Sequence, residues 1–345
     1  MKGAWTSTWV LLLIILTSGC QIRMDVLDPA GGVAEEQRHL IVFSLVVMMI
    51  VLVVVFILFT KFIWRYRENS KADRPDHTLR NDNKKLEITW TVLPVVVLGV
   101  LAVPMLMQAY NLETKADRDA YRVKVTGRQY WWQFDYPNEN IRTSQELHLP
   151  ANEEVVIELE ASDVIHSFWV PQLGGKKDAI PGETNRLYLE TGDPGVYEGK
   201  CAELCGAAHT DMRFQVVVEE EEDFEAWSDA VKQDITPEET EPEEEGSANK
   251  GERIFQENCL ACHAVDGADT ENDRGPNLAL YGDQKKISGM MTNDKENLKA
   301  WLREPESFKP STEMPAYDNL TEEEMDALVD YLHSITSDKA EEGRD

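Results

Sequence analysis

The sequence contains few cysteines and few basic residues. Only five of its 345 residues are cysteine, and they fall in three separate short motifs, so none remains for a disulfide framework. Lysine and arginine number 34 against 63 acidic residues, which gives a net charge of -29. This balance argues against binding to nucleic acid, which needs cations to neutralise phosphates, and suits basic protein partners attracted by electrostatic steering. The length allows two or three domains.

Charge is also missing from two long apolar runs, residues 40–60 and 88–112, and neither run contains a histidine. Each run is long enough to cross ~30 Å of hydrocarbon as a helix. We expect a membrane hairpin over residues 35–112, with helices at about 40–64 and 88–110; a buried core helix is the alternative. Without histidine clusters, the runs cannot build a membrane-buried metal centre of their own.

The connection between the two runs is strongly basic. It carries eight lysines and arginines, at positions 61, 65, 67, 71, 74, 80, 84 and 85. The positive-inside rule places this connection in the cytoplasm, and everything after about residue 113 therefore lies on the outer face of the membrane.

The first 20 residues have the pattern of an export signal. Lys2 precedes an apolar run at residues 10–16, which ends in Thr-Ser-Gly-Cys20. The ending resembles a bacterial lipoprotein cleavage box, in which Cys20 becomes a lipidated N-terminus. An ordinary signal peptide with an incidental cysteine is the alternative.

Short alternating runs follow the membrane segment. They occupy residues 121–126, 155–160, 185–190 and 213–218, with glycine and proline breaks at 174–175, 181–182 and 192–195. Regularly spaced short strands of this kind predict a β-sandwich or barrel, here over about residues 113–232.

One loop of this predicted domain concentrates soft metal ligands. Cys201, Cys205, His209 and Met212 lie within twelve residues, and His166 lies upstream. Sulfur combined with imidazole favours copper. A disulfide between the cysteines, a zinc site and a simple packing role for Met212 are the alternatives.

The loop pattern Cys-x-Glu-x-Cys-x-x-x-His-x-x-Met resembles the binuclear copper (CuA) site of cytochrome c oxidase subunit II. The resemblance implies a cupredoxin fold, a Greek-key β-barrel. It implies that Cys201 and Cys205 bridge two copper ions, and that His166 and His209 each cap one ion. Met212 and the backbone carbonyl of Glu203 complete the set, and the Glu203 carboxylate reaches a magnesium ion shared with subunit I.

Two further segments share this resemblance. Residues 87–94 match a Glu-x-x-Trp-Thr-x-x-Pro signature, which implies that Glu87 lies at the mouth of a proton path; a solvated interface residue is the alternative. The aromatic run at 127–136 implies that electrons enter through Tyr130, Trp131 or Trp132, whereas core packing would explain the same residues.

The chain continues with an acidic segment and a second redox motif. Residues 233–249 predict a flexible, self-repelling linker with an end-to-end distance of ~20–24 Å, which would hold the next domain at roughly millimolar effective concentration. Cys259-Leu-Ala-Cys262-His263 is the attachment motif of a covalently bound haem c. A zinc site there would need two further ligands.

The segment 250–338 resembles an all-α class I cytochrome c. Gly275-Pro-Asn-Leu278 and Met314-Pro315 carry this resemblance, which implies that Met314 is the sixth iron ligand. Met290 and Met291 are alternatives that lack the following proline. A histidine and methionine pair raises the haem potential and leaves no open site on the iron. The pattern at 321–332 predicts a capped amphipathic closing helix.

Taken as a whole, the chain resembles subunit II of a bacterial cytochrome c oxidase with a fused cytochrome domain, a multidomain membrane protein. This implies that cytochrome c or an upstream cytochrome complex supplies electrons, which pass from the haem to the copper pair and then to subunit I. There, with subunit III as a further partner, oxygen is reduced and protons are pumped. The alternatives are an electron-delivery subunit of a CuA-type nitric oxide reductase, or a non-catalytic membrane protein for copper delivery or redox sensing.

Overall fold

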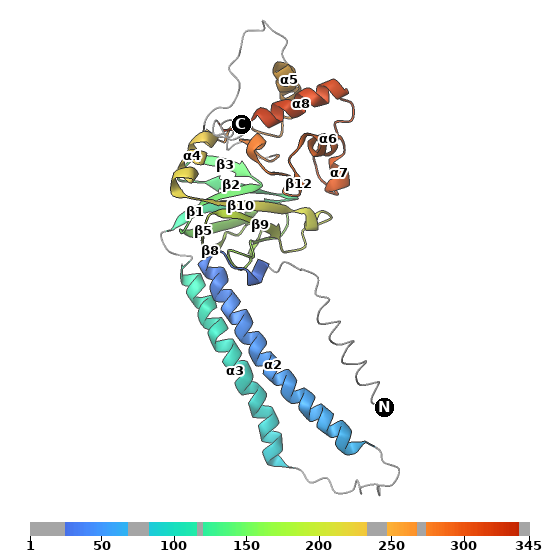
Figure 1. The fold of residues 1–345 in the computed structure, drawn as a ribbon. Helices are drawn as coiled ribbons and strands as arrows, with labels where there is room; N and C mark the ends of the chain where they lie inside the picture. The colour runs from blue at the N-terminus through green and yellow to red at the C-terminus, as the bar shows by residue number, and fades with distance from the viewer. Residues whose placement is uncertain (1–24, 68–82, 116–119, 233–246, 268–273, 338–345) are drawn as a thin grey trace.

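The computed structural model describes residues 25–67, 83–115, 120–232, 247–267 and 274–337. The proposed signal with Cys20, three of the basic residues between the apolar runs, and most of the acidic linker lie outside these ranges. Along the molecule, a helix pair is followed by a β domain and then by a small helical domain (Figure 1).

The two apolar runs form the long helices α2 (Gly32–Tyr66) and α3 (Lys84–Lys115), which lie side by side after a short turn, η1 (Asp25–Leu27) (Figure 1). Both are long and apolar enough to span a membrane, and no residue of either apolar window is buried within the chain. Both helices extend beyond the predicted bounds. The hydrophobic run fixes only the part in lipid, and polar flanks lengthen each helix at both ends; the start of α2 and the end of α3 reach the β domain (Figure 1).

The hairpin contacts the β domain just before α2 begins and where α3 ends. The backbone N–H groups of Ala30 and Gly31 donate to the Gln172 carbonyl at 2.8 and 3.1 Å, just before α2 begins. At the end of α3, the Lys115 ammonium lies 2.8 Å from the Glu190 carboxylate. The membrane segment and the β domain are therefore in direct contact and need no long linker between them.

The β domain is a sandwich of two five-stranded sheets. One has the order β3-β2-β1-β5-β8 and the other β4-β10-β9-β6-β7; β1 with β5 and β4 with β10 are parallel, and the other pairs are antiparallel. The strands are β1 (Tyr121–Arg128), β2 (Trp131–Tyr136), β3 (Ile141–Ser144), β4 (Glu146–Pro150), β5 (Glu154–Ala161), β6 (His166–Trp169), β7 (Lys177–Ala179), β8 (Asn185–Glu190), β9 (Gly195–Cys201) and β10 (Arg213–Glu219). The four predicted strands are thus confirmed as parts of β1, β5, β8 and β10.

The space between the sheets is filled by aromatic side chains. Trp132, Phe134, Phe168 and Phe214 are completely buried, and the Phe168 and Phe214 rings stack with their centroids 4.7 Å apart. Helix α4 (Glu221–Lys232) closes the domain, and its Trp227 stacks on His148 at 4.1 Å. His148 also lies 2.9 Å from the Glu219 carboxylate, well inside a packed structural cluster. These contacts give His148 a structural role, away from the metal-binding residues.

The helical domain contains α5 (Ser247–Asn258), η3 (Tyr281–Asp283), the short pair β11 (Lys286–Ile287) and β12 (Met291–Thr292), α6 (Lys295–Arg303), α7 (Pro305–Phe308) and α8 (Glu322–Ser334). Helix α8 is the predicted closing helix. The Thr321 side chain accepts the Glu324 N–H, and the Glu324 carboxylate accepts the Thr321 N–H; together they form a capping box. Where α5 crosses α8, a Cβ on Gly251 would lie 2.1 Å from the Ala327 carbonyl, so glycine permits the close approach.

The helical domain is seated on the β domain rather than separated from it (Figure 1). Ala279 and Leu280 belong to the same apolar cluster as the β-domain core. Three backbone N–H groups donate across the boundary: Asn277 to Ser144 Oγ at 3.1 Å, Lys285 to Glu146 Oε1 at 2.9 Å, and Arg142 to the Gly267 carbonyl at 2.7 Å. The tether predicted from residues 233–249 therefore joins two domains that already share an interface.

Candidate metal centre and haem pocket

The two segments that carry the soft ligands meet at one end of the sandwich. Strand β6 begins at His166 and strand β9 ends at Cys201, and the two strands pair through Phe168 and Cys201. The following loop, with the turn η2 (His209–Asp211), returns the chain so that Met212 precedes β10. Strand pairing thus brings His166 to a loop that lies 35 residues later in the sequence.

All six residues predicted to bind copper are brought together here. The Cys201 and Cys205 sulfur atoms are 3.8 Å apart. Around this pair lie His166 Nδ1, 4.0 Å from Cys201 Sγ, and His209 Nδ1, 3.7 Å from Cys205 Sγ. Met212 Sδ is 3.8 Å from Cys205 Sγ, and the Glu203 carbonyl oxygen is 3.2 Å from Cys201 Sγ.

The chemistry of this donor set fits copper. Both cysteines are free thiols, and their separation is far beyond the ~2.05 Å of a disulfide. Zinc sites use cysteine, histidine and carboxylate ligands, whereas a thioether such as that of Met212 is a poor ligand for zinc and suits copper. Cys201, Cys205 and Met212 are buried, so a bound ion would be shielded from water on the protein side.

The pKa values of the two thiols are shifted in opposite directions. The hydrogen bond from Cys205 lowers the pKa of the Cys201 thiol to about 3, with help from His166. The resulting thiolate, together with burial, raises the pKa of the Cys205 thiol. One thiolate therefore forms readily, and a metal cation must displace the second proton, as metal binding to cysteine commonly requires.

His166 is oriented by Asp163, a residue that the sequence alone did not reveal. The Asp163 carboxylate lies 2.7 Å from His166 Nε2 and also accepts the backbone N–H groups of Val164 and Gln129, each at 2.6 Å. Burial would raise the pKa of Asp163, but these hydrogen bonds outweigh it and hold the pKa below its usual value. Because Nε2 is engaged by the carboxylate, Nδ1 is directed at Cys201.

Replacing Asp163 with asparagine is expected to weaken copper binding by roughly 10–100-fold, because partners of a ligating histidine fix its tautomer and basicity. Asparagine keeps the size of the side chain while removing its charge. Competition with a copper chelator would measure the affinity. The exposed Glu183→Gln on the same domain is the matched control. Equal affinities in the two variants would contradict an orienting role for Asp163.

The segment before β2 supports the loop at residues 201–212, called the metal loop below. The Tyr130 hydroxyl accepts the Ala207 backbone N–H at 3.0 Å, and the Gln129 side chain donates to the Cys205 carbonyl at 2.5 Å. A Cβ on Gly206 would lie 2.4 Å from the Tyr130 hydroxyl, so the loop fits closely against this ring. Gln129 was not among the predicted site residues, because its partner is 76 positions away in the sequence.

The remaining predicted residues occupy different settings. Trp132 is fully buried, with its ring 5.9 Å from the His166 ring, whereas Trp131 is half-buried beneath the Arg128 guanidinium. Glu87 is exposed in the first turn of α3, remote from the metal loop along the helix. Of these aromatic residues, Tyr130 contacts the metal loop and Trp132 lies beside His166.

A cavity lies within the helical domain. Its lining includes the four predicted haem-binding residues: Cys259, Cys262, His263 and Met314. His263 Nδ1 lies 2.7 Å from the Pro276 carbonyl, which takes up the N–H and leaves Nε2 available as an iron ligand. Burial lowers the pKa of His263 and so favours the neutral imidazole that ligation requires. The residues present fit a haem held through two cysteines. Met290 and Met291 pack against the domain core.

The haem cavity opens onto the β domain. Gln129, Tyr130 and Trp131 form part of its lining, together with Ser144 and Gln145. The segment that supports the metal loop on one side therefore borders the haem cavity on the other.

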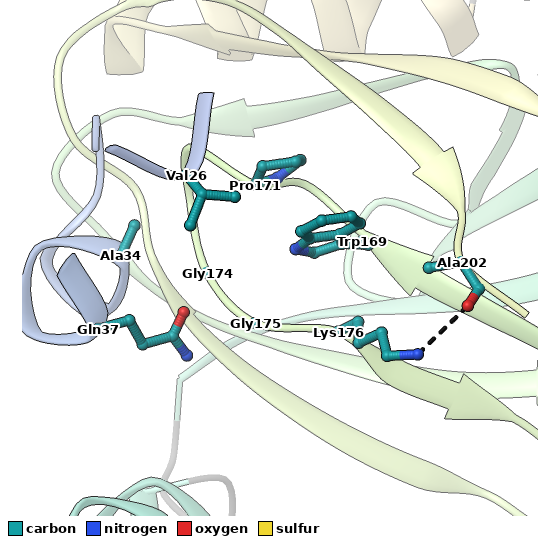
Figure 2. A pocket seen from close by; sticks show the side chains of 9 residues that line it. All are labelled: Val26, Ala34, Gln37, Trp169, Pro171, Gly174, Gly175, Lys176 and Ala202. Atoms are coloured by element: carbon teal, nitrogen blue, oxygen red, sulfur yellow. Dashed lines mark hydrogen bonds between the residues drawn. The ribbon is translucent and has the colours of Figure 1, made fainter. Parts of the chain in front are cut away.

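A separate cleft at the junction of α2 and the β domain contains none of the predicted site residues. Figure 2 shows Val26, Ala34 and Gln37 on one side, and Trp169 and Lys176 on the other. The Lys176 ammonium donates to the Ala202 carbonyl at 3.2 Å, directly after Cys201 (Figure 2). This cleft borders the start of the metal loop, at Ala202.

Comparison with known proteins gives a consistent result along the chain. Family models match residues 19–107 (cytochrome c oxidase subunit II, transmembrane domain), 139–220 (cytochrome c oxidase subunit II, periplasmic domain) and 248–336 (cytochrome c). Cytochrome c oxidase subunit 2 of Alkalihalophilus pseudofirmus is 40% identical, covering 94% of both chains, and that of Bacillus subtilis is 37% identical, covering 98% of this chain and 99% of the relative.

Among solved structures, the periplasmic domain of cytochrome oxidase subunit II from Bradyrhizobium japonicum is 29% identical, with a TM-score of 0.32. It covers 32% of this chain and 94% of that one. The full-length relatives and the three family models are sufficient for assignment. The chain belongs to the cytochrome c oxidase subunit II family, in the form with an attached cytochrome c domain, and is the subunit through which electrons enter a haem-copper oxidase.

Proposed function

We propose that this chain takes electrons from a c-type cytochrome at a covalent haem c and delivers them through a binuclear copper centre to subunit I. The bound haem and copper pair supply one-electron redox chemistry, and oxygen reduction with proton pumping belongs to the partner. One observation carries this proposal: residues 129–131 line the haem cavity, and the Gln129 and Tyr130 side chains also bond to the metal loop.

The helical domain's residues hold and orient the haem. Cys259 and Cys262 would hold the haem through thioether bonds, and His263, oriented by the Pro276 carbonyl, would supply a nitrogen ligand to its iron. Met314 would supply a second ligand; it lies in the cavity lining beside Pro315. A haem held by a histidine and a methionine would carry electrons and would leave no open site for oxygen.

In the β domain, Cys201 and Cys205 would hold the copper ions through their sulfur atoms, and His166 and His209 would supply the imidazole ligands. Met212 and the Glu203 carbonyl would complete the donor set. The bound copper would exchange single electrons, and the paired strands on either side of the loop would hold its donor atoms in place during that exchange. Little reorganisation is then needed for transfer. The carboxylate of Glu203 contributes to a magnesium site shared with subunit I.

The membrane hairpin sets the orientation of this pathway. The basic connection between α2 and α3 remains in the cytoplasm, so both redox domains lie on the outer face of a bacterial cell membrane. Glu87, in the first turn of α3, is then near the cytoplasmic side, where a proton path into subunit I would open. Subunit III is a further partner of the complex.

Rapid mixing of the purified oxidase complex with reduced cytochrome c tests the pathway. We expect the haem c absorbance to change first, the near-infrared copper absorbance second, and the haem of subunit I last. In the half-reduced copper centre, electron paramagnetic resonance should show one unpaired electron shared equally by two copper nuclei. A haem c that reduces while the copper absorbance never changes would refute the proposal.

A further inference from the structure

A buried lysine joins the two redox domains. Lys309 follows α7 in the cytochrome domain and is only 2% exposed. Its ammonium donates to the Tyr130 carbonyl of the β domain at 2.7 Å, and to the Oγ and carbonyl oxygen of Ser288 at 2.7 and 3.3 Å. These three acceptors use all three donors of the ammonium.

Because Lys309 is buried, its hydrogen bonds depend on contact between the cytochrome domain and the β domain. An ammonium removed from water is stable only when its donors are satisfied. One of its three acceptors, the Tyr130 carbonyl, belongs to the other domain, so separation of the domains breaks that bond. Burial also lowers the pKa of Lys309 to about 7, although the negative charge of Asp211 opposes this shift.

Lys309 also lies between the two cofactor sites. It lines the haem cavity with Met314, which follows five positions later, and a turn bond from the Thr312 N–H to its carbonyl fixes this segment. Across the boundary it holds Tyr130, whose hydroxyl accepts the Ala207 N–H of the metal loop. A continuous set of contacts thus runs from the segment that carries Met314 to the loop between Cys205 and His209.

We propose that Lys309 is a positioning residue for internal electron transfer: it latches the cytochrome domain to Tyr130 and so holds the haem over the copper loop. This inference rests on the proposed function. Electron transfer rates fall exponentially with the distance between cofactors, so a latch that favours the docked arrangement sets the rate. The acidic linker keeps the domain nearby, and Lys309 selects one orientation.

The test compares Lys309→Met with Lys295→Met in the full oxidase complex. Methionine keeps the length of the side chain but removes its three donors. Lys295 is an exposed lysine of the same domain, paired with Asp330, so its variant makes the same substitution away from the interface. We expect haem-to-copper electron transfer to slow by about tenfold in Lys309→Met, with unchanged haem and copper spectra, and to stay normal in Lys295→Met.

Amide hydrogen exchange provides a readout that is independent of electron transfer. The Asn277 and Lys285 N–H groups donate across the interface, so their exchange should speed up by about tenfold when the latch is lost. Equal exchange and equal transfer rates in the two lysine variants would overturn the inference. If instead the unmodified complex passes no electrons from haem to copper, the proposed function fails, while the exchange result still decides the latch.

A second variant covers the case in which Lys309→Met does not fold. Ser288→Gly removes one acceptor of the ammonium and suits the local backbone, where φ is +53°. Because the Tyr130 bond remains, we expect a smaller change in the same direction for both readouts. No change in exchange or transfer would count against the latch.

Discussion

Replacing Cys205 with serine is expected to stop electron delivery to subunit I while haem c still becomes reduced. The substitution exchanges a sulfur for a poorly ionised hydroxyl at the centre of the donor set, within 3.8 Å of Cys201, His209 and Met212. Loss of an orienting partner already costs metal sites about 10–100-fold, so loss of a bridging ligand should cost ~100-fold or more. Metal analysis should show that the bound copper is lost.

The control for this variant is Leu204→Ala. Leu204 lies next to Cys205 in the same loop, but its side chain is 77% exposed and contributes no ligand atom. Copper content and electron transfer should be unaffected in this control. Stopped-flow spectroscopy of the two complexes would separate haem reduction from the later steps. A Cys205→Ser complex with two copper ions and normal turnover would exclude the proposed ligand set.

Replacing both Cys259 and Cys262 with alanine is expected to abolish covalent haem attachment and reduce electron uptake from cytochrome c to the background rate. The cavity between α5, α6 and α8 is lined by apolar residues that a haem would cover, such as Phe255, Trp301 and Leu332. Without the cofactor, this lining would lose its packing partner, so the domain should also unfold at a lower temperature. Copper bound at residues 201–212 should remain.

Haem staining after denaturing electrophoresis distinguishes covalent from non-covalent haem and is the direct measurement. Leu260→Ala is the matched control, because it changes the same motif while leaving both cysteines and their spacing intact; Leu260 is 45% exposed. The control should retain covalent haem. Haem that remains attached after denaturation in the double variant would show that other residues bind it.

The two metal-binding motifs illustrate how much local sequence can reveal. Cys201, Cys205, His209 and Met212 lie within one loop, and Cys259, Cys262 and His263 within one turn, so fixed spacing encodes most of each donor set. Chain connectivity keeps such ligands close in any fold. The membrane helices were equally predictable, because an uncharged run of more than 20 residues is readable without tertiary information.

The residues that the sequence did not reveal are those whose partners are distant along the chain. Asp163 looked like any loop carboxylate until strand pairing set His166 beside Cys201. Lys309 resembles any other surface lysine in an acidic protein, yet its acceptor lies 179 positions earlier. Hydrogen bonds of this kind depend on how separate elements dock, and no local periodicity records that.

The sequence by itself determined the parts: two apolar helices, a run of short strands, a soft-ligand loop and a haem attachment motif. Each depends on the composition or spacing of neighbouring residues. Only the tertiary structure decided how they meet, with residues 129–131 between the haem cavity and the copper loop and with Lys309 buried at the boundary. The physical reason is that packing and the satisfaction of buried polar groups act across space, between residues that the sequence leaves far apart.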